Sequence, residues 1–393
     1  MATSSPPSRR SSGADPLRLE RSIPAEALDA IRAPFLLAGA VPTDAPVLQP
    51  LGLLLDLAGE AMRSRLFVVS GDGGDEACLR PDFTVAVARQ HLSSGAAAGR
   101  YLYEGKAFRV APRGSDRAEE FLQIGVEAFE AADPVAADAE IAALAWAGAA
   151  AGGRDDLTLL LGDVGLFAAF VDSLDLTPPL GARLKRTFSR PRQLKAELEG
   201  EAAPVVSSER SRIAALLAGL PEAEAAAVLQ ELWSLAGIEP VGGRRPAEIA
   251  HRLVEKAEVV KAGRLSADQA DKVRAFLAVG DAPGAALDAI AALAGPNRAP
   301  LDAAIEGWRK RLAGMVARGA PADRMRLNAA FGRAFGYYDG YLFEVRSAAL
   351  GEERPVAAGG RYDGLPARLG SETKTGAVGC MVRPARAYAG GGE

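Results

Sequence analysis

The chain is poor in the residues that build metal centres and disulfide frameworks. Among its 393 residues there are only two cysteines, Cys78 and Cys380, and two histidines, His91 and His251. None of the four lies at a spacing typical of metal ligands, so we expect no metal site. Two distant cysteines do not suggest a disulfide framework either, which favours the cytoplasm as the compartment of the protein.

Long apolar runs and a surplus of basic residues are also missing. No apolar run is long enough to span a bilayer, so we expect no membrane segment. Residues 1–16 contain arginines but lack the apolar core of a secretory signal, and we expect them to form a disordered tail. Lysine and arginine number 46 against 50 acidic residues, a balance that argues against nucleic acid as the main partner.

The residues that are present indicate an α+β fold. Apolar residues in 17–66 have mostly helical spacing, and GDGGD (71–75) lies between two apolar runs, as in a β-hairpin. Residues 101–111 and 119–131 predict two strands joined by a polar loop, and residues 156–163 predict a buried strand. Residues 133–153 predict an alanine-rich helix that begins with Asp-Pro and ends at Gly-Gly.

The second half of the sequence becomes helical and then returns to strands. From 176 to 319, alanine, leucine and charged residues dominate, which predicts a mostly helical insertion. Strand-like runs follow at 341–345, 357–364 and 375–382. We therefore predict three parts: a tail (1–16), a core (17–175 with 320–393) and the insertion (176–319).

The predicted strand FLQIGVEAF (121–129) carries polar residues on one face only. Side chains alternate along a strand, so Gln123 and Glu127 share one face, with Gly125 between them, and the opposite face is purely apolar. Glycine inside a strand often marks close approach of a ligand or of another chain segment. The polar face either meets water, as in an ordinary half-buried strand, or lines a pocket.

Two other polar stretches have both a structural and a functional interpretation. Asp82 and Thr84 are expected at the start of a helix, with Asp82 as its N-cap, and an ionised Asp82 could also hold an ammonium group. Arg109 is either solvated at a sheet edge or a bidentate clamp for a carboxylate or phosphate.

The same ambiguity holds for the aromatic stretches near the end of the chain. Tyr337 and Tyr338 follow Arg333 and are either core residues or part of a polar pocket. Asp363-Gly364 predicts a hairpin turn. Taken together, these stretches offer an acid for an amine, a base for a carboxylate and polar groups for a side chain, a set that suits an amino acid ligand.

Six motifs resemble, in order, those of the histidyl-tRNA synthetases. The resemblance covers roughly residues 17–175 and 320–390 and implies a class II synthetase core, with an antiparallel sheet flanked by helices and usually a dimer. The motifs are LRPDFT (79–84), FR (108–109), EFLQIGVE (120–127), RAFGYYDGYLFE (333–344), GGRYDGL (359–365) and AVGCMV (377–382).

The resemblance also implies roles for individual residues in histidine binding. Its amine-side contacts fall on Asp82, Thr84 and Gln123, with aspartate at 82 where the family usually has glutamate. Arg109 matches the motif 2 arginine, and Glu127 matches the imidazole-side contact. The remaining matches are Arg333, for the carboxylate and activated phosphate, and Tyr338 and Tyr362, around the imidazole, with Tyr337 beside them.

Several positions depart from the pattern of the enzymes, mostly on the nucleotide side. Ala111 replaces the glutamate that faces the adenine of ATP, and Arg383 replaces a motif 3 glycine, where its side chain should crowd the ATP site. Ala385 replaces the motif 3 glutamate before the final Arg386, and Gly336 replaces an aspartate. Only seven residues follow Arg386, so we also expect no anticodon-binding domain.

These departures resemble the synthetase paralogues that regulate ATP phosphoribosyltransferase in histidine biosynthesis. That resemblance implies a non-catalytic subunit without a cofactor, which binds histidine and joins a short-form catalytic subunit in a hetero-oligomer. It also implies a homodimer of the synthetase-like core, with no nucleic acid or membrane partner. The alternatives are a truncated histidyl-tRNA synthetase-like enzyme that activates histidine with ATP, and an RNA-binding module.

Overall fold

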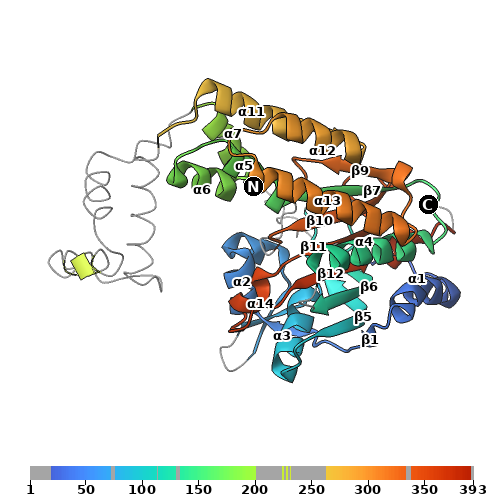
Figure 1. Cartoon of the computed structure of the whole chain (residues 1–393). Helices are drawn as coiled ribbons and strands as arrows, with labels where there is room; N and C mark the ends of the chain where they lie inside the picture. Colours follow the sequence, from blue (N-terminus) through green and yellow to red (C-terminus); the bar gives the residue numbers. More distant parts are fainter. Residues whose placement is uncertain are drawn as a thin grey trace, which may run out of the picture.

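The computed structural model describes residues 19–71, 76–112, 114–129, 133–200, 263–332 and 338–390, with isolated positions between 224 and 231. Within these residues, a nine-stranded sheet and a separate three-stranded sheet form, and helices cover the large sheet (Figure 1). The predicted hairpin turn at 72–75 and the predicted tail at 1–16 lie outside the described residues.

The large sheet is mainly antiparallel, as predicted. In spatial order its strands are β1 (Val41–Pro42), β5 (Gly99–Phe108), β6 (Glu120–Phe129), β12 (Ala377–Val382), β11 (Ala357–Arg361), β10 (Tyr341–Ser347), β7 (Leu157–Asp163), β9 (Met325–Asn328) and β8 (Gly280–Asp281). From β5 to β7 every neighbouring pair is antiparallel, whereas the outer strands β1 and β9 pair in parallel with β5 and β7. The small sheet has the order β2 (Leu48–Pro50), β4 (Glu76–Leu79) and β3 (Val68–Ser70).

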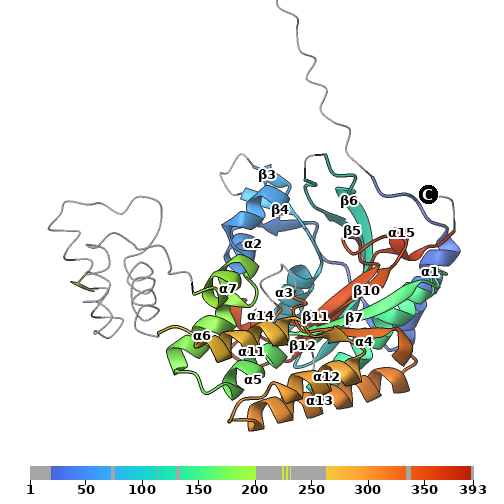
Figure 2. The same ribbon diagram turned by 90° about the horizontal axis from the view of Figure 1, so that it is seen from above.

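Helices pack on the large sheet from two sides. In Figure 2, α12 and α13 lie on one side, and α2 lies on the other with the small sheet. The helices of the first half are α1 (Ala25–Leu37), α2 (Leu51–Ala58), η1 (Glu60–Arg65), α3 (Thr84–Ser94), α4 (Pro134–Ala150), α5 (Val164–Ser173), α6 (Pro178–Thr187) and α7 (Pro191–Leu198). Those of the second half are α11 (Ala267–Leu277), α12 (Pro283–Ala292), α13 (Ala299–Ala317), η2 (Ala322–Arg324), α14 (Gly364–Arg368) and α15 (Pro384–Ala387).

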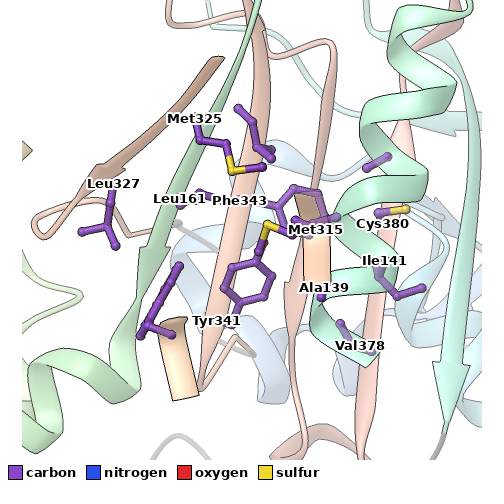
Figure 3. Close-up of a cluster of buried hydrophobic side chains, with 14 of the residues drawn as sticks. Ala139, Ile141, Leu161, Met315, Met325, Leu327, Tyr341, Phe343, Val378 and Cys380 are labelled. Carbon is purple, nitrogen blue, oxygen red and sulfur yellow. The ribbon is translucent and has the colours of Figure 1, made fainter. Parts of the chain in front are cut away.

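Strand β6 has the two faces that its alternation predicts. Ile124 and Val126 belong to the main core, which α1, α4 and α13 cover, whereas Phe121 and Phe129 belong to a second core with α2 and α3. Figure 3 shows part of the main core, where Met315 of α13 meets Tyr341 and Phe343 of β10 beside α4. Because β6 lies between the two cores, both of its faces are buried.

Helix α4 begins and ends where the sequence predicts. The Asp133 side chain accepts hydrogen bonds from the backbone N of Val135 at 3.0 Å and of Ala136 at 3.1 Å, and Pro134 occupies the first turn. Gly153 follows the helix with φ of 90°, a conformation that favours glycine. The predicted strands around 101–131, 156–163 and 341–345 are confirmed as β5, β6, β7 and β10.

Two local predictions are wrong. The N-cap of α3 is Phe83 and receives no side-chain cap, so Asp82 lies just before the helix with its carboxylate directed elsewhere. Asp363 and Gly364 begin α14 rather than a hairpin turn. The physical reason is Asp339, whose carboxylate accepts the backbone N–H of both Asp363 and Gly364, at 3.1 and 2.6 Å, and thereby stabilises the start of a helix.

The described part of the predicted insertion is helical, from α6 and α7 through α11 to α13. It also contains β8, which pairs with β9 and so joins the large sheet. Among the described residues, no helix combines the length and the apolar character that crossing a bilayer requires.

Candidate functional site

A polar pocket lies over β5, β6 and β12 of the large sheet, at the point where the chain enters α3. It encloses about 350 Å³ of empty space, part of which is open to solvent. Six of the nine predicted site residues line it: Asp82, Thr84, Arg109, Gln123, Glu127 and Tyr338. Its other lining residues are Tyr103, Ala358, Gly379, Cys380 and Met381.

Glu127 is the most enclosed acid of this pocket, with only 1% of its surface exposed. The Thr84 hydroxyl donates to its Oε1 at 2.7 Å, and the Tyr362 hydroxyl donates to its Oε2. Burial raises the pKa of the Glu127 carboxyl to about 8, and the nearby Asp82 adds to this rise, whereas the hydroxyls of Tyr362, Thr84 and Tyr103 lower it. Glu127 is therefore mostly protonated at neutral pH, so it can either donate a hydrogen bond or accept one.

Glycines opposite and beside Glu127 make room for the polar groups of the pocket. Gly379 pairs with Glu127 across β12 and β6, and a Cβ atom at position 379 would overlap the Glu127 carboxylate. Gly125 pairs with Tyr103, and a Cβ atom there would overlap the Tyr103 hydroxyl and the Cys380 carbonyl oxygen. Of the two explanations for a glycine within β6, close approach of another chain segment is therefore the one that the structure supports.

Gln123 presents an unpaired amide to the pocket. Its side chain is 1% exposed, and within the described residues neither its Nε2 nor its Oε1 has a hydrogen-bond partner. A buried amide without partners costs free energy, because it has lost its hydrogen bonds to water. The interpretation of this strand face as water-exposed is thus wrong, and the amide is available to a ligand.

Arg109 and Asp82 form the charged side of the pocket. The Arg109 Nη2 lies 3.8 Å from Asp82 Oδ2, and its Nε donates to the Pro81 carbonyl oxygen at 2.8 Å. The Arg109 guanidinium lies 5.5 Å from the Phe121 ring centroid. A cation and an anion thus lie together, next to the uncharged Gln123 and Glu127, which suits a ligand that carries both charges.

The structure places the predicted tyrosines differently. Tyr338 lines the pocket, whereas Tyr362 lies beneath Glu127 and contacts it through its hydroxyl. The two rings meet edge to face, with centroids 6.3 Å apart. Arg333 and Tyr337 lie outside the described residues, as does Gly336.

Sequence reasoning missed Tyr103, Cys380 and Met381 as pocket residues. Tyr103 stacks on Phe83 with ring centroids 4.4 Å apart, and its hydroxyl donates to the Cys380 carbonyl oxygen at 3.2 Å. The only signal was the phase of the strand, since Tyr103 shares a face of β5 with Tyr101 and Ala107. Its place beside Gly125 follows from the register of β5 and β6, which the sequence does not reveal.

Of the residues predicted at the nucleotide side, Arg383 lies near the pocket, because it shares the Phe121 ring with the pocket residue Arg109. Arg383 is buried, with its guanidinium 3.6 Å from the Phe121 ring centroid and an ion pair to Glu20. Ala111 donates its backbone N–H to Glu119 at 3.1 Å, and Arg386 donates to the Pro355 carbonyl oxygen at 3.0 Å. Burial lowers the pKa of the Arg383 guanidinium. Among the described residues, no group of histidine, cysteine or acidic side chains could hold a metal ion.

The fold and the pocket define a class II aminoacyl-tRNA synthetase-like protein. A solved Bacillus halodurans C structure, described as an ATP phosphoribosyltransferase regulatory subunit/histidyl-tRNA synthetase, superposes with a TM-score of 0.66 at 19% identity, covering 97% of this chain and 85% of that one. Histidyl-tRNA synthetase from Nostoc sp. PCC 7120 superposes with a TM-score of 0.59 at 18% identity, covering 96% and 74%. At these identities the likeness concerns the fold.

Sequence comparison is more specific. The family model for histidyl-tRNA synthetase matches residues 42–241 and 247–385. The ATP phosphoribosyltransferase regulatory subunit of Mesorhizobium japonicum is 39% identical over 86% of this chain and 89% of its own length. That of Brucella anthropi is 34% identical over 90% and 94%. The chain therefore belongs to the histidyl-tRNA synthetase family, among the ATP phosphoribosyltransferase regulatory subunits.

Proposed function

We propose that this chain is the regulatory subunit of an ATP phosphoribosyltransferase, acts in the first step of histidine biosynthesis and binds histidine in the pocket over β6. The names of its relatives support the regulatory role. The observation that carries the ligand site is the buried Gln123 amide, which lacks partners among the described residues and lines the pocket.

The pocket offers a partner for each polar group of histidine. Its ammonium group meets Asp82 and Gln123, with Thr84 close by, and its carboxylate meets Arg109 or Arg333. Its imidazole meets Glu127. The other contacts to the ring come from Tyr337 and Tyr338, and Tyr362 acts on it through Glu127. A protonated Glu127 suits this role, because a neutral imidazole has one nitrogen that accepts a hydrogen bond and one that donates.

The same proposal makes the chain a binding subunit and not a catalyst. The buried Arg383, stacked on Phe121 and paired with Glu20, supports the loss of the nucleotide site. Ala111 supports it too, because its side chain accepts no hydrogen bond from an adenine. Histidine then regulates the complex by favouring one of its conformations, which requires different affinities for the two.

The proposal extends to partners and organisation. The chain assembles with a short-form catalytic subunit in a hetero-oligomer in the cytoplasm, pairs with a second copy through the synthetase-like core and binds no nucleic acid. Residues 17–175 and 320–393 form this core, and 176–319 form the insertion. Exposed apolar residues of β1, β2 and β3 support pairing of two copies: Val41, Leu48, Val68 and Val69.

Calorimetry with histidine tests the ligand site. Glu127→Ala should weaken binding about two- to tenfold, because a hydrogen bond between uncharged groups contributes about 0.5–1.5 kcal/mol. Glu140→Ala is the matched control, since Glu140 lies on α4, pairs with Arg100 of β5 and does not line the pocket. Equal affinity of wild type and Glu127→Ala would show that the imidazole is misplaced.

Two further measurements separate the regulatory role from its alternatives. Co-purification should recover a phosphoribosyltransferase subunit whose activity depends on both chains. Histidine- and ATP-dependent pyrophosphate exchange should be absent, and clear exchange would instead indicate a synthetase-like enzyme. Tight tRNA binding with steep salt dependence would indicate an RNA-binding module.

A further inference from the structure

A second polar cluster lies beside the pocket, outside its lining, and is centred on Arg361. This residue ends β11 and is only 6% exposed. Its Nε donates to Asp138 Oδ1 at 2.8 Å, and its Nη2 donates to the Pro134 carbonyl oxygen at 2.9 Å. Its Nη1 donates to Asp363 Oδ1 at 2.8 Å. One guanidinium thus joins the first turns of α4 to the segment that follows β11.

The Asp138 end of this cluster is firmly held. Asp138 is fully buried in α4, and its Oδ2 accepts a hydrogen bond from Nε of Arg311 in α13 at 2.6 Å. Both carboxylate oxygens therefore have an arginine partner. Removing one member of a buried ion pair leaves the other charge uncompensated, so such pairs define the position of their side chains sharply.

Tyr362 lies in the chain between Arg361 and Asp363, two members of this cluster. Its backbone N donates to the Ala377 carbonyl oxygen at 2.8 Å, and Asp363 Oδ1 accepts the Ala377 N–H at 2.8 Å in addition to Arg361. Successive side chains of an extended segment point to opposite faces, so Arg361 faces α4 and Tyr362 faces the pocket. The Tyr362 hydroxyl there donates to Glu127.

We propose that Arg361 is a positioning residue for the ligand pocket. By holding the 361–363 segment against Asp138, it keeps the Tyr362 hydroxyl on Glu127 and so fixes the orientation of the carboxyl group that recognises the ligand ring. This inference deepens the proposed function and rests on it for the identity of the ligand. The positioning itself is a property of the ligand-free protein.

Titration of Glu127 reports this positioning directly. The titratable groups that act on Glu127 are Asp82 before α3, Tyr103 on β5, Tyr362 after β11 and Cys380 on β12. Tyr338 before β10 and the charged Arg109 line the same pocket. Tyr362 donates to the carboxylate and lowers the pKa of Glu127, against the larger effect of burial. Loss of its hydroxyl from Oε2 should therefore raise the titration midpoint.

The experiment follows the Glu127 carboxyl carbon by NMR in the ligand-free protein, with Glu127→Gln to identify its signal. Tyr362→Phe should raise the midpoint by about one pH unit or more, as expected for loss of a hydrogen bond to a charged group. Arg361→Gln should shift it in the same direction. The double variant should shift it no further than Tyr362→Phe alone, because both changes act through one hydroxyl.

Arg100→Gln is the matched control. Arg100 lies on β5 and does not line the pocket. It makes a two-point ion pair, at 2.7 and 3.0 Å, with Glu140 of α4, the helix that also carries Asp138. It should lower stability without moving the Glu127 midpoint. Arg361→Lys should restore part of the wild-type value, because a single ammonium can still pair with Asp138.

A wild-type midpoint in Arg361→Gln, together with a shifted one in Tyr362→Phe, would overturn the proposal and leave Arg361 a purely structural role. Additive shifts in the double variant would overturn it too. If Arg361→Gln does not fold, Asp363→Ala provides the same comparison, since Asp363 is half exposed and its Oδ1 accepts hydrogen bonds from both Arg361 and Ala377. Shifted midpoints in a protein that does not bind histidine would support the positioning and reject the proposed ligand.

Discussion

Glu127 is a buried acid that also faces a pocket. Its carboxyl is enclosed by hydroxyl groups and by the backbone of β12, and no cation contacts it among the described residues. Burial without a cationic partner favours the neutral form of a carboxyl. A neutral acid is a suitable contact for a neutral imidazole, because a hydrogen bond can form between them and neither group needs a counterion.

The raised pKa of Glu127 predicts a pH dependence of stability. Its pKa is about 8 in the folded protein and about 4.5 in the unfolded chain, so the folded state binds the proton more tightly. The stability that the more tightly bound proton contributes is fully present below the unfolded-state pKa. It is lost as the pH rises from there toward 8, by at most about 1.4 kcal/mol per pH unit.

Urea unfolding at pH 5, 6, 7 and 8 measures this effect against Glu127→Gln, which does not titrate. The free energy of unfolding of the wild type should fall relative to that of the variant as the pH rises. A difference between the two that stays constant with pH would show that Glu127 is ionised throughout this range.

Site residues could be predicted from the sequence where the strand alternation alone decides their direction. Gln123 and Glu127 share a face of β6 and both line the pocket. Tyr103 could not be predicted, because it approaches Gly125 only in one register of β5 against β6. The sequence predicts Asp82 as the N-cap of α3, but the N-cap is Phe83, and Asp82 lines the pocket instead.

Helix α4 connects the sheet to the cluster around Asp138, so its first turn is a sensitive element. Asp133→Ala should lower the free energy of unfolding by about 1 kcal/mol, because two backbone N–H groups lose their acceptor. Asp133→Asn retains an acceptor oxygen and should stay close to wild type. Urea midpoints of the three proteins provide the test, and an unchanged Asp133→Ala would mean that the cap contributes nothing.

Among the elements, long and strongly patterned ones could be predicted, and short ones could not. The pattern of β6, β7 and α4 extends over seven or more residues, and all three are confirmed. Strands β8 and β9 have two and four residues, which are too few to show a hydrophobic period. They are defined by their pairing, β9 with β7 and β8 with β9. The Asp-Gly pair at 363–364 predicts a turn locally, but the distant Asp339 makes it a helix start.

At the scale of the whole molecule, several apolar residues are exposed near β1 and in the small sheet. Leu37 is 89% exposed and Val41 is 62% exposed, far more than residues of a core. Grouped exposed apolar residues commonly mark an interface between proteins. This agrees with the proposed pairing of two copies.

Sedimentation velocity of Val41→Lys/Leu48→Lys tests this pairing. The wild type should sediment as a dimer, and the variant should sediment as a monomer with an unchanged circular dichroism spectrum, because two charges would be buried without partners in the interface. Val316→Lys is the control, since Val316 is 46% exposed on α13. A dimeric Val41→Lys/Leu48→Lys protein would place the interface elsewhere.

The overlap between Glu127 and any side chain at position 379 links two positions that lie far apart in the chain. As long as the acid is present, glycine is the only residue that leaves its carboxyl group where it is. Loss of the acid would remove the nearest of these overlaps, and only the Val126 carbonyl oxygen, 2.8 Å from such a Cβ atom, would still have to move slightly. The two sites should therefore change together in evolution, and the order matters, since the acid has to be lost first.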